Sequence, residues 1–363
     1  MNERKYYLDW IKSLAILLLV LAHAARVFDY LPFYVKSGNH LWAEILIRFL
    51  DSWFMPLFFV IGGMAACYSI EKRGAAKFRS ERAKRLLVPL GFALISTLPI
   101  LGYIAYRFSN PESSDGFWTY LPRFYTFDAS QLQGYTGTFS VAHLWYLLYL
   151  YIFSMLSGPI FRRLNEGRIP AWAKRMPLFF AAICVTLGKL TLLPYPNPIY
   201  FLAFFWLGYA IAAERNDFDV FRQLRDRPAL VWTAAIVLMS VLWAARIYYL
   251  PGFGPFAVYL ALQPVYTVNA LLWVLLVLFY GAKYFTRPHP VLNYLSEASL
   301  YVYIVHMSIA MFVAWLLSDR FSSGISFAII TVATYAATFL FYEALVRRWN
   351  PLRFVFGLGP KKS

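Results

Sequence analysis

The chain has 363 residues, of which 60% are hydrophobic and only 14% are charged. Soluble domains usually carry about 25% charged residues, so this composition leaves too little polar surface for a soluble globular protein. The net charge of +16 would suggest a nucleic-acid partner in a soluble protein, but these basic residues lie between apolar runs. We therefore expect a protein embedded in a lipid bilayer, with no nucleic-acid partner.

Apolar runs of about 20 residues predict an all-α, polytopic bundle of about ten transmembrane helices. Proline removes a helical hydrogen bond, so Pro56 should kink the long second span near Met55. The sequence shows no internal repeat and no separate soluble domain, so residues 1–363 are expected to form one membrane domain. The predicted spans cover residues 10–30, 41–70, 86–106, 143–160, 176–193, 198–213, 229–249, 261–282, 297–317 and 323–346.

The distribution of charge between the spans predicts the orientation of the chain. The loop from Glu71 to Arg85 is rich in lysine and arginine, whereas the loops LLPYPNP and YYLPGFGPF are nearly uncharged. Because basic loops are retained in the cytoplasm, we expect both termini there and a multi-pass location in the inner membrane. The longest outer segment, roughly 107–142, is long enough to be functional. Cys67 and Cys184 lack metal-ligand spacing, and we expect no metal site.

His23 lies inside the first apolar run, where no water can solvate its ring. An ionisable residue at this depth indicates a functional site that faces the bundle interior. Lys12 precedes it by 11 residues, about three helical turns or ~16 Å, so the two share a face, with Asp9 near the same stripe. A packing role for the histidine is the simpler alternative.

The second span carries Glu44, Arg48 and Asp51 at positions i, i+4 and i+7, which share one helical face. Asp51 is expected at a depth close to that of His23. A carboxylate beside an imidazole would fix its tautomer and raise its basicity. Alternatively, Arg48 and Asp51 only neutralise each other, because buried charges need partners whatever their role.

Two further spans contribute polar side chains. Ser299, Tyr303 and His306 fall on one face of the ninth span. His306 is a second candidate for chemistry, although a membrane histidine can also serve as a hydrogen bond between helices. His143 and Trp145 open the fourth span at its outer end, where they could meet a substrate or simply belong to an aromatic belt.

Arginines recur every third residue in the segment RSERAKRLLVP. Arg79, Arg82 and Arg85 would run down one side of a helix start. Their forked donors suit phosphate groups, although an ordinary positive-inside loop would have the same composition.

Five blocks of the sequence, taken in order, resemble the acyltransferase family 3 of integral membrane acyltransferases. LDWIKSLAILLLVLAHAA is similar to the family's LDxxRxxA…H helix, with Lys12 where that family usually has arginine. Lysine keeps the charge there but loses bidentate recognition. FMPLFFVIGGMAACYS resembles the second-helix motif, and Arg82 with Arg85 matches the family's R-x-x-R. HLWYLLYL and SEASLYVYIVH look most like the branch that contains the glucan-modifying succinyltransferase.

The resemblance implies an acyl-CoA-dependent O-acyltransferase, an enzyme that transfers groups other than aminoacyl groups. Cytoplasmic acetyl-CoA or succinyl-CoA would be the donor substrate, with no bound cofactor, and a hydroxyl of an extracytoplasmic carbohydrate or glycan would be the acceptor. The oligomeric state cannot be predicted. The positions and the resemblance together predict a site with catalytic residues His23, Asp51 and His306, donor-binding residues Lys12, Arg82 and Arg85, acceptor-side residues His143 and Trp145, and supporting residues Asp9, Arg48, Ser299 and Tyr303.

A proton-coupled transporter or exporter of a small molecule or glycan is the main alternative, because it also explains intramembrane His, Asp and Arg. Such a protein would favour inverted repeats and paired broken helices, and the sequence shows no internal symmetry. A purely structural scaffold would explain none of the polar residues at depth.

Overall fold

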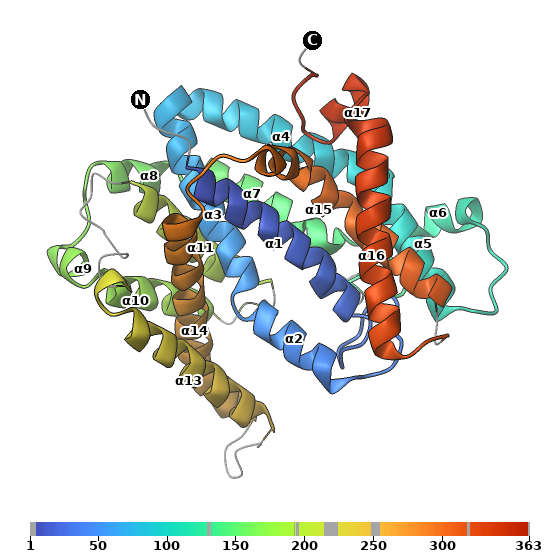
Figure 1. The fold of residues 1–363 in the computed structure, drawn as a ribbon, viewed down its shortest axis with the longest axis horizontal. Helices are drawn as coiled ribbons and strands as arrows, with labels where there is room; N and C mark the ends of the chain where they lie inside the picture. The colour runs from blue at the N-terminus through green and yellow to red at the C-terminus, as the bar shows by residue number, and fades with distance from the viewer. Residues whose placement is uncertain are drawn as a thin grey trace. The chain divides into compact units, whose positions relative to one another are not determined.

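The computed structural model describes residues 5–128, 131, 133–191, 193, 196–213, 224–247, 255–317 and 320–361. Throughout these residues the chain forms helices and no strand, which confirms the predicted all-α class (Figure 1). The helices divide into two compact units, each assembled from three separate stretches of the chain. Four of the five boundaries between the stretches fall inside α1, α2, α4 and α7, so these four helices contribute residues to both units.

The first unit combines the chain up to Lys12 with residues 49–80 and 152–288. Prolines occupy the first turn of several of its helices, where their fixed φ suits a helix start. Asn197 caps one of them, since its side chain accepts a hydrogen bond of 3.0 Å from the Tyr200 backbone N–H. The helices that lie wholly in this unit are α3 (Phe54–Arg73), α8 (Gly158–Asn165), α9 (Ala171–Arg175), α10 (Pro177–Lys189), α11 (Pro198–Ala212), α13 (Pro228–Ile247) and α14 (Pro255–Tyr284).

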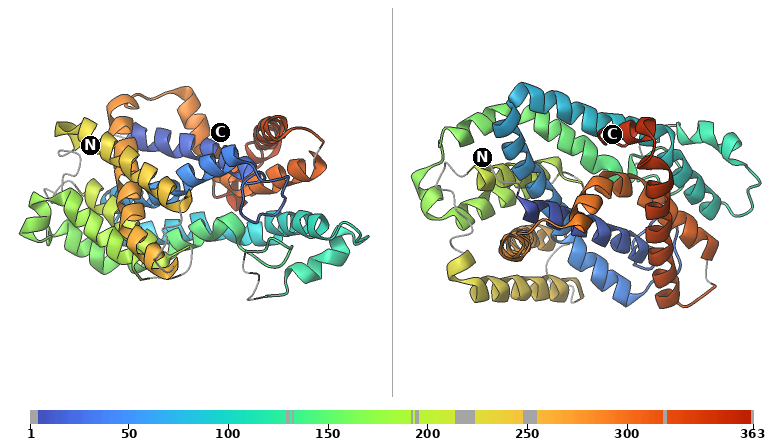
Figure 2. Two further views of the ribbon diagram at one scale, coloured as in Figure 1. Left: turned by 90° about the horizontal axis from the view of Figure 1, so that it is seen from below. Right: turned by 45° about the horizontal axis from the view of Figure 1, so that its top comes forward.

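Helices α3 and α11 form the closest helix contact of the first unit. A Cβ atom built on Gly63 of α3 would lie 1.9 Å from the Phe205 carbonyl oxygen of α11. A Cβ atom on Gly208 of α11 would lie 2.0 Å from the Val60 carbonyl oxygen of α3. Both glycines are therefore required for the two backbones to approach this closely. Helices α13 and α14 pack against each other in the same unit, and the two views of Figure 2 show them side by side.

The second unit combines residues 13–48, 81–151 and 289–363. Its helices are connected by side-chain bonds to backbone carbonyls. Tyr335 donates to the Leu17 carbonyl at 2.5 Å, and Ser308 donates to the Thr97 carbonyl at 2.8 Å. Its helices are α1 (Tyr6–Ala25), α2 (Leu41–Asp51), α4 (Ala75–Ile95), α5 (Thr97–Ser109), α6 (Phe117–Phe124), η2 (Ala142–Leu144), α7 (Trp145–Leu156), α15 (Pro290–Leu317), α16 (Ser323–Phe341), η4 (Tyr342–Val346) and α17 (Asn350–Val355), the first three and α7 in part.

Six helical stretches of the described chain are long and apolar enough to cross a membrane, or seven if one bent pair is a single span. The bent pair is α7 with α8, which meet at an angle of 60°. The six are residues 6–25, 41–73, 75–109, 262–284, 290–317 and 323–346. The remaining predicted spans correspond to the shorter apolar helices Pro177–Lys189, Pro198–Ala212 and Pro228–Val241.

The kink predicted in the second span occurs as a break between α2 and α3, at Ser52 and Trp53. Pro56 explains its position, because proline has no N–H to donate to the Ser52 carbonyl four residues earlier. The sequence analysis expected the kink near Met55. The break lies slightly earlier, at Ser52, whose carbonyl has no helical partner.

Candidate functional site

Three histidine rings meet in the second unit, one each from α1, η2 and α15. The Nδ1 atom of His23 lies 2.7 Å from the Nε2 atom of His306. Their rings are nearly parallel, at 10°, with centroids 5.0 Å apart. The ring of His143 stands edge-on to both, 5.0 Å from His306 and 6.0 Å from His23. We call these three residues the histidine cluster.

His306 is the most enclosed member of the cluster, with no solvent-exposed surface. Its second ring nitrogen, Nδ1, lies 2.9 Å from the Val302 carbonyl oxygen one turn earlier on α15. Both nitrogens of the His306 ring are therefore engaged, one by backbone and one by His23. The partner of the His23 Nδ1 atom is therefore a ring 283 residues away in the sequence.

His143 is held by a reciprocal pair of bonds to α15. Its Nε2 atom donates to the Tyr303 carbonyl oxygen at 2.9 Å, and the Tyr303 hydroxyl donates to the His143 carbonyl oxygen. Its other nitrogen, Nδ1, is buried and has no hydrogen-bond partner in the described part of the chain. Ala142, just before it, has a φ of 46°, a left-handed conformation that costs a non-glycine residue free energy. The backbone is thus strained where it presents this ring.

The loop that follows α1 covers one side of His23. The Phe33 ring stacks on the His23 ring, with centroids 6.2 Å apart and 29° between the planes. The Arg26 guanidinium lies 4.8 Å from the centre of the Phe33 ring, within cation–π range. Tyr135 packs against the same phenylalanine at 5.9 Å. An aromatic and cationic surface therefore borders the proposed base.

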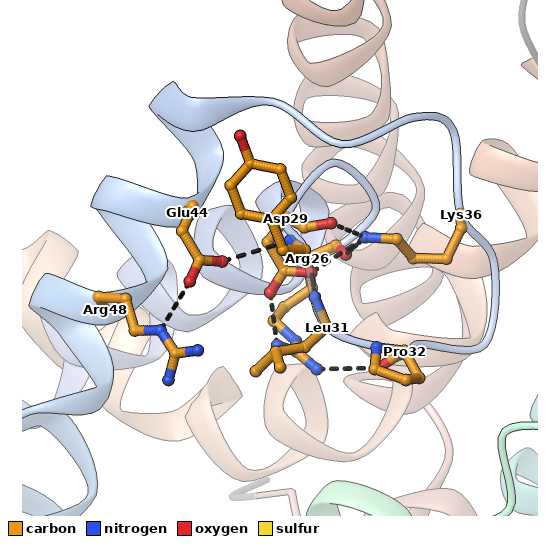
Figure 3. A network of polar contacts seen from close by, with 8 residues as sticks. Arg26, Asp29, Leu31, Pro32, Lys36, Glu44 and Arg48 are labelled. Atoms are coloured by element: carbon orange, nitrogen blue, oxygen red, sulfur yellow. Dashed lines mark hydrogen bonds and ion pairs between the residues drawn. The ribbon is translucent and has the colours of Figure 1, made fainter. Parts of the chain in front are cut away.

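Asp29 holds this loop in place, as Figure 3 shows. Its carboxylate has no exposed surface and pairs with Arg26 at 2.5 Å and with Lys36 at 3.0 Å. The same carboxylate accepts a bond of 3.3 Å from the Leu31 backbone N–H. Burial lowers the pKa of Lys36 from its ordinary value, and the hydrogen bond to Asp29 opposes that shift. The loop is therefore fixed by a buried ion network, the Asp29 network.

Glu44 on α2 extends this arrangement to the next helix (Figure 3). It accepts a bond of 3.2 Å from the Tyr30 backbone N–H and pairs with Arg48 at 2.8 Å. The ion pair of Arg48 is therefore made with Glu44, one turn before it, rather than the pair with Asp51 that the sequence analysis considered. Asp51, the last residue of α2, is exposed.

Arg82 and Arg85 both lie on α4, three residues apart, but in different surroundings. Arg85 is exposed, whereas Arg82 is half-buried and interacts electrostatically with Tyr146 of α7. The Tyr146 ring lies 5.9 Å from the ring of Tyr303, which binds the histidine cluster. The C-terminal segment borders Arg85, because a Cβ atom on Gly357 would lie 3.0 Å from the Arg85 carbonyl oxygen.

The remaining predicted residues lie on α1, α7 and α15. Lys12 and Asp9 belong to the early turns of α1, in the stretch assigned to the first unit. Ser299 is buried and donates to the Ser296 carbonyl of its own helix at 2.8 Å. The Trp145 ring lies 5.3 Å from that of Tyr149. Within the described residues, no group of three or more His, Cys, Asp and Glu side chains could hold a metal ion.

The sequence analysis missed Arg26, Asp29 and Phe33. Arg26 and Asp29 are three residues apart at the end of an apolar run, a spacing that suits an ion pair on a helix end. That signal was available in the sequence. Nothing in the sequence indicated that Phe33 would fold back onto His23.

Comparisons with known proteins agree along the full length of the chain. Proteins named glucans biosynthesis protein C, from Escherichia coli strains K12 and SMS-3-5 / SECEC, are 24% identical to this chain. These alignments cover 99% of this chain and 95% of each relative. No solved structure matches. The sequence model of the family described as "Acyltransferase domain", acyltransferase family 3, matches residues 5–343. The protein therefore belongs to the acyltransferase family 3.

Proposed function

We propose that this protein is a membrane-embedded O-acyltransferase that moves an acetyl or succinyl group from acyl-CoA to a hydroxyl of a glucan. The observation that carries the proposal is the histidine cluster, in which His23 sits within an apolar helix and is held by His306 at 2.7 Å. Family membership supports the acyl chemistry, and the name of the relatives supports a glucan acceptor.

The proposed reaction needs one base. The acceptor hydroxyl oxygen forms a bond to the thioester carbonyl carbon while its proton moves to His23. The carbon–sulfur bond then breaks, and the thiolate of CoA leaves with the proton that His23 returns. A histidine suits both transfers, because its ordinary pKa lies near neutral pH. His306 and Asp51 are proposed to assist His23 in these proton transfers. His306 is supported by its contact with His23, and Asp51 by its position in the sequence on the helical face of Glu44 and Arg48.

The donor is proposed to bind along α4. CoA carries a pyrophosphate and a 3′-phosphate, which forked guanidinium donors bind with charge-assisted hydrogen bonds. Arg82 and Arg85 match the family's R-x-x-R, and Lys12 adds a cation on the helix that carries His23. The electrostatic interaction of Arg82 with Tyr146, whose ring lies 5.9 Å from that of Tyr303, supports a donor that extends from the arginines toward the cluster.

The acceptor is proposed to approach from the loop after α1. This loop places Phe33 and Arg26 beside His23, where they would border the acceptor. The buried Nδ1 lone pair of His143 could accept a bond from an acceptor hydroxyl. Trp145 would border this side, while Arg48 supports α2 through Glu44, Ser299 and Tyr303 support α15, and Asp9 supports the start of α1.

The membrane arrangement is part of the proposal. Residues 1–363 would act as one acyltransferase domain with about ten spans in the inner membrane, the three shorter apolar helices included. Both termini and the basic segment from Glu71 to Arg85, which the structure places at the end of α3 and the start of α4, would face the cytoplasm, where CoA is found. The donor arginines would then lie on the side of the donor.

Incubation of the purified protein with labelled acetyl-CoA or succinyl-CoA and an oligoglucan tests the proposal. We expect base-labile label on the glucan and a stoichiometric release of free CoA thiol. The absence of transfer with either donor, together with proton-driven movement of a glycan across vesicles, would instead favour a transporter, which the buried polar residues would also suit.

A further inference from the structure

We propose that His306 is a positioning residue that selects one tautomer of His23, with the proton on Nδ1 and the lone pair on Nε2. The Nε2 atom of His23 is then the atom that takes the proton of the acceptor hydroxyl. This inference rests on the acyl transfer proposed above and adds to it the reactive atom and the group that defines it.

The backbone of α15 fixes which nitrogen of His306 carries a proton. The Nδ1 atom of His306 lies 2.9 Å from the Val302 carbonyl oxygen. A carbonyl oxygen can only accept a hydrogen bond, so this nitrogen must carry a proton. A neutral imidazole has a single N–H group, and the Nε2 atom of His306 therefore holds a lone pair.

The lone pair of His306 determines which nitrogen of His23 carries the proton. Their facing nitrogens are 2.7 Å apart, and a bond between two nitrogens requires one proton. Because the Nε2 atom of His306 has none, the Nδ1 atom of His23 must donate. The proton of neutral His23 is thereby fixed on Nδ1, and its Nε2 atom is left as the basic one.

The burial of His306 keeps its Nε2 lone pair available to His23. His306 has no exposed surface, so no water competes for its Nε2 lone pair. When His23 takes up a proton, its Nδ1–H bond to His306 persists and becomes charge-assisted. The Nε2 atom of His143 donates to the Tyr303 carbonyl, so that nitrogen is not an acceptor for His23.

Two amide variants at position 306 separate tautomer selection from simple helix anchoring. A glutamine side chain places an amide oxygen near the position of Nε2, where it can accept from His23. An asparagine side chain is shorter and reaches only the region of Nδ1, where it can donate to the Val302 carbonyl. The two variants are similar in polarity. The glutamine keeps the bond to His23, whereas the asparagine keeps the bond to the Val302 carbonyl.

We expect His306→Gln to retain acyl transfer within about 10-fold of the parent, and His306→Asn to lose roughly 10²–10⁴-fold in kcat, the usual value of a positioned base. The KM for the donor should be unchanged in both. If His306→Asn were more active than His306→Gln, the role of His306 would be to anchor the helix. Equal loss in both variants, with both folded, would assign it to carrying a proton itself. Either result overturns the proposal.

A spectroscopic measurement tests the tautomer without any turnover. In protein labelled with ¹⁵N in its histidine rings, the His23 signals are those absent from His23→Gln. We expect a protonated Nδ1 and a bare Nε2, and a proton on Nε2 would overturn the proposal. If the expected tautomer is found and no donor supports transfer, the proposed function fails while the positioning role of His306 stands.

Discussion

At the scale of single residues, the histidine cluster supplies hydrogen-bond partners to buried imidazole nitrogens. An imidazole inside an apolar helix needs partners for its nitrogens, since no water is available. His23 obtains one from His306, which in turn uses a backbone carbonyl. The remaining nitrogen of His23 is thereby kept for chemistry.

The donor arginines allow a residue-scale prediction. Arg82→Lys and Arg85→Lys keep the charge of the loop but lose the guanidinium fork, so topology should be preserved while phosphate binding weakens. Loss of one charge-assisted contact should reduce acyl-CoA affinity by roughly 10–150-fold, or ~1.5–3 kcal/mol. Equilibrium binding of acetyl-CoA to the detergent-solubilised protein measures this effect.

The matched control is Arg79→Lys, because Arg79 is exposed and lies one step earlier on the same helix. Its affinity should stay near that of the parent. If all three variants bind the donor alike, the arginines serve only to orient the loop.

At the scale of elements, the contact between α3 and α11 depends on two glycines. We predict that Gly208→Ala destabilises the protein, because the added Cβ would lie 2.0 Å from the Val60 carbonyl oxygen. Overpacking of this kind typically costs about 1–3 kcal/mol. Thermal unfolding in detergent should show a lower Tm.

Gly91 provides the control for that substitution, since nothing lies within 4 Å of a Cβ built there. Gly91→Ala, inside helix α4, should raise stability by roughly 0.5–1 kcal/mol through its lower unfolded-state entropy. A Tm that moves in the same direction for both variants would contradict the close contact.

The Asp29 network supports a second prediction about an element, the loop of residues 26–40. Asp29→Asn leaves Arg26 and Lys36 without their buried carboxylate, a change that typically costs about 3–5 kcal/mol. We expect faster amide hydrogen exchange throughout the loop and slower acyl transfer, because Phe33 loses its place on His23.

Asp226→Asn removes an exposed carboxylate that pairs with Arg225 at 3.3 Å, and such surface pairs contribute about 0–1 kcal/mol. Its exchange pattern and turnover should match the parent. Unchanged exchange in the loop of Asp29→Asn would show that the ion network does not hold it.

At the scale of the whole molecule, the sequence predicts periodic features well and long-range pairing poorly. The apolar runs predict where helices lie, and the depth of His23 follows from the helix rise. The His23–His306 bond joins residues 283 positions apart, and no local pattern indicates which helices are neighbours. The strained φ of Ala142 is equally invisible, because alanine gives no sequence signal for a left-handed turn.

Topology gives a prediction at this scale. In a protein lacking Cys67 and Cys184, an impermeant thiol reagent applied from outside should label Ser114→Cys and leave Lys77→Cys unlabelled. Both positions are exposed, so burial does not determine the outcome. Outside labelling at position 77, or protection at position 114 that permeabilisation relieves, would reverse the orientation and separate the donor arginines from cytoplasmic CoA.

The most direct measurement is the initial rate at which reconstituted protein transfers labelled acyl groups from acyl-CoA to a glucan, for the parent and His23→Ala at equal abundance. We predict transfer by the parent and a rate roughly 10²–10⁴-fold lower for His23→Ala, because a positioned base contributes that much. His289→Ala, which changes an exposed histidine, should behave as the parent. Near-parent transfer by a folded His23→Ala protein would contradict the central role of His23 in this site.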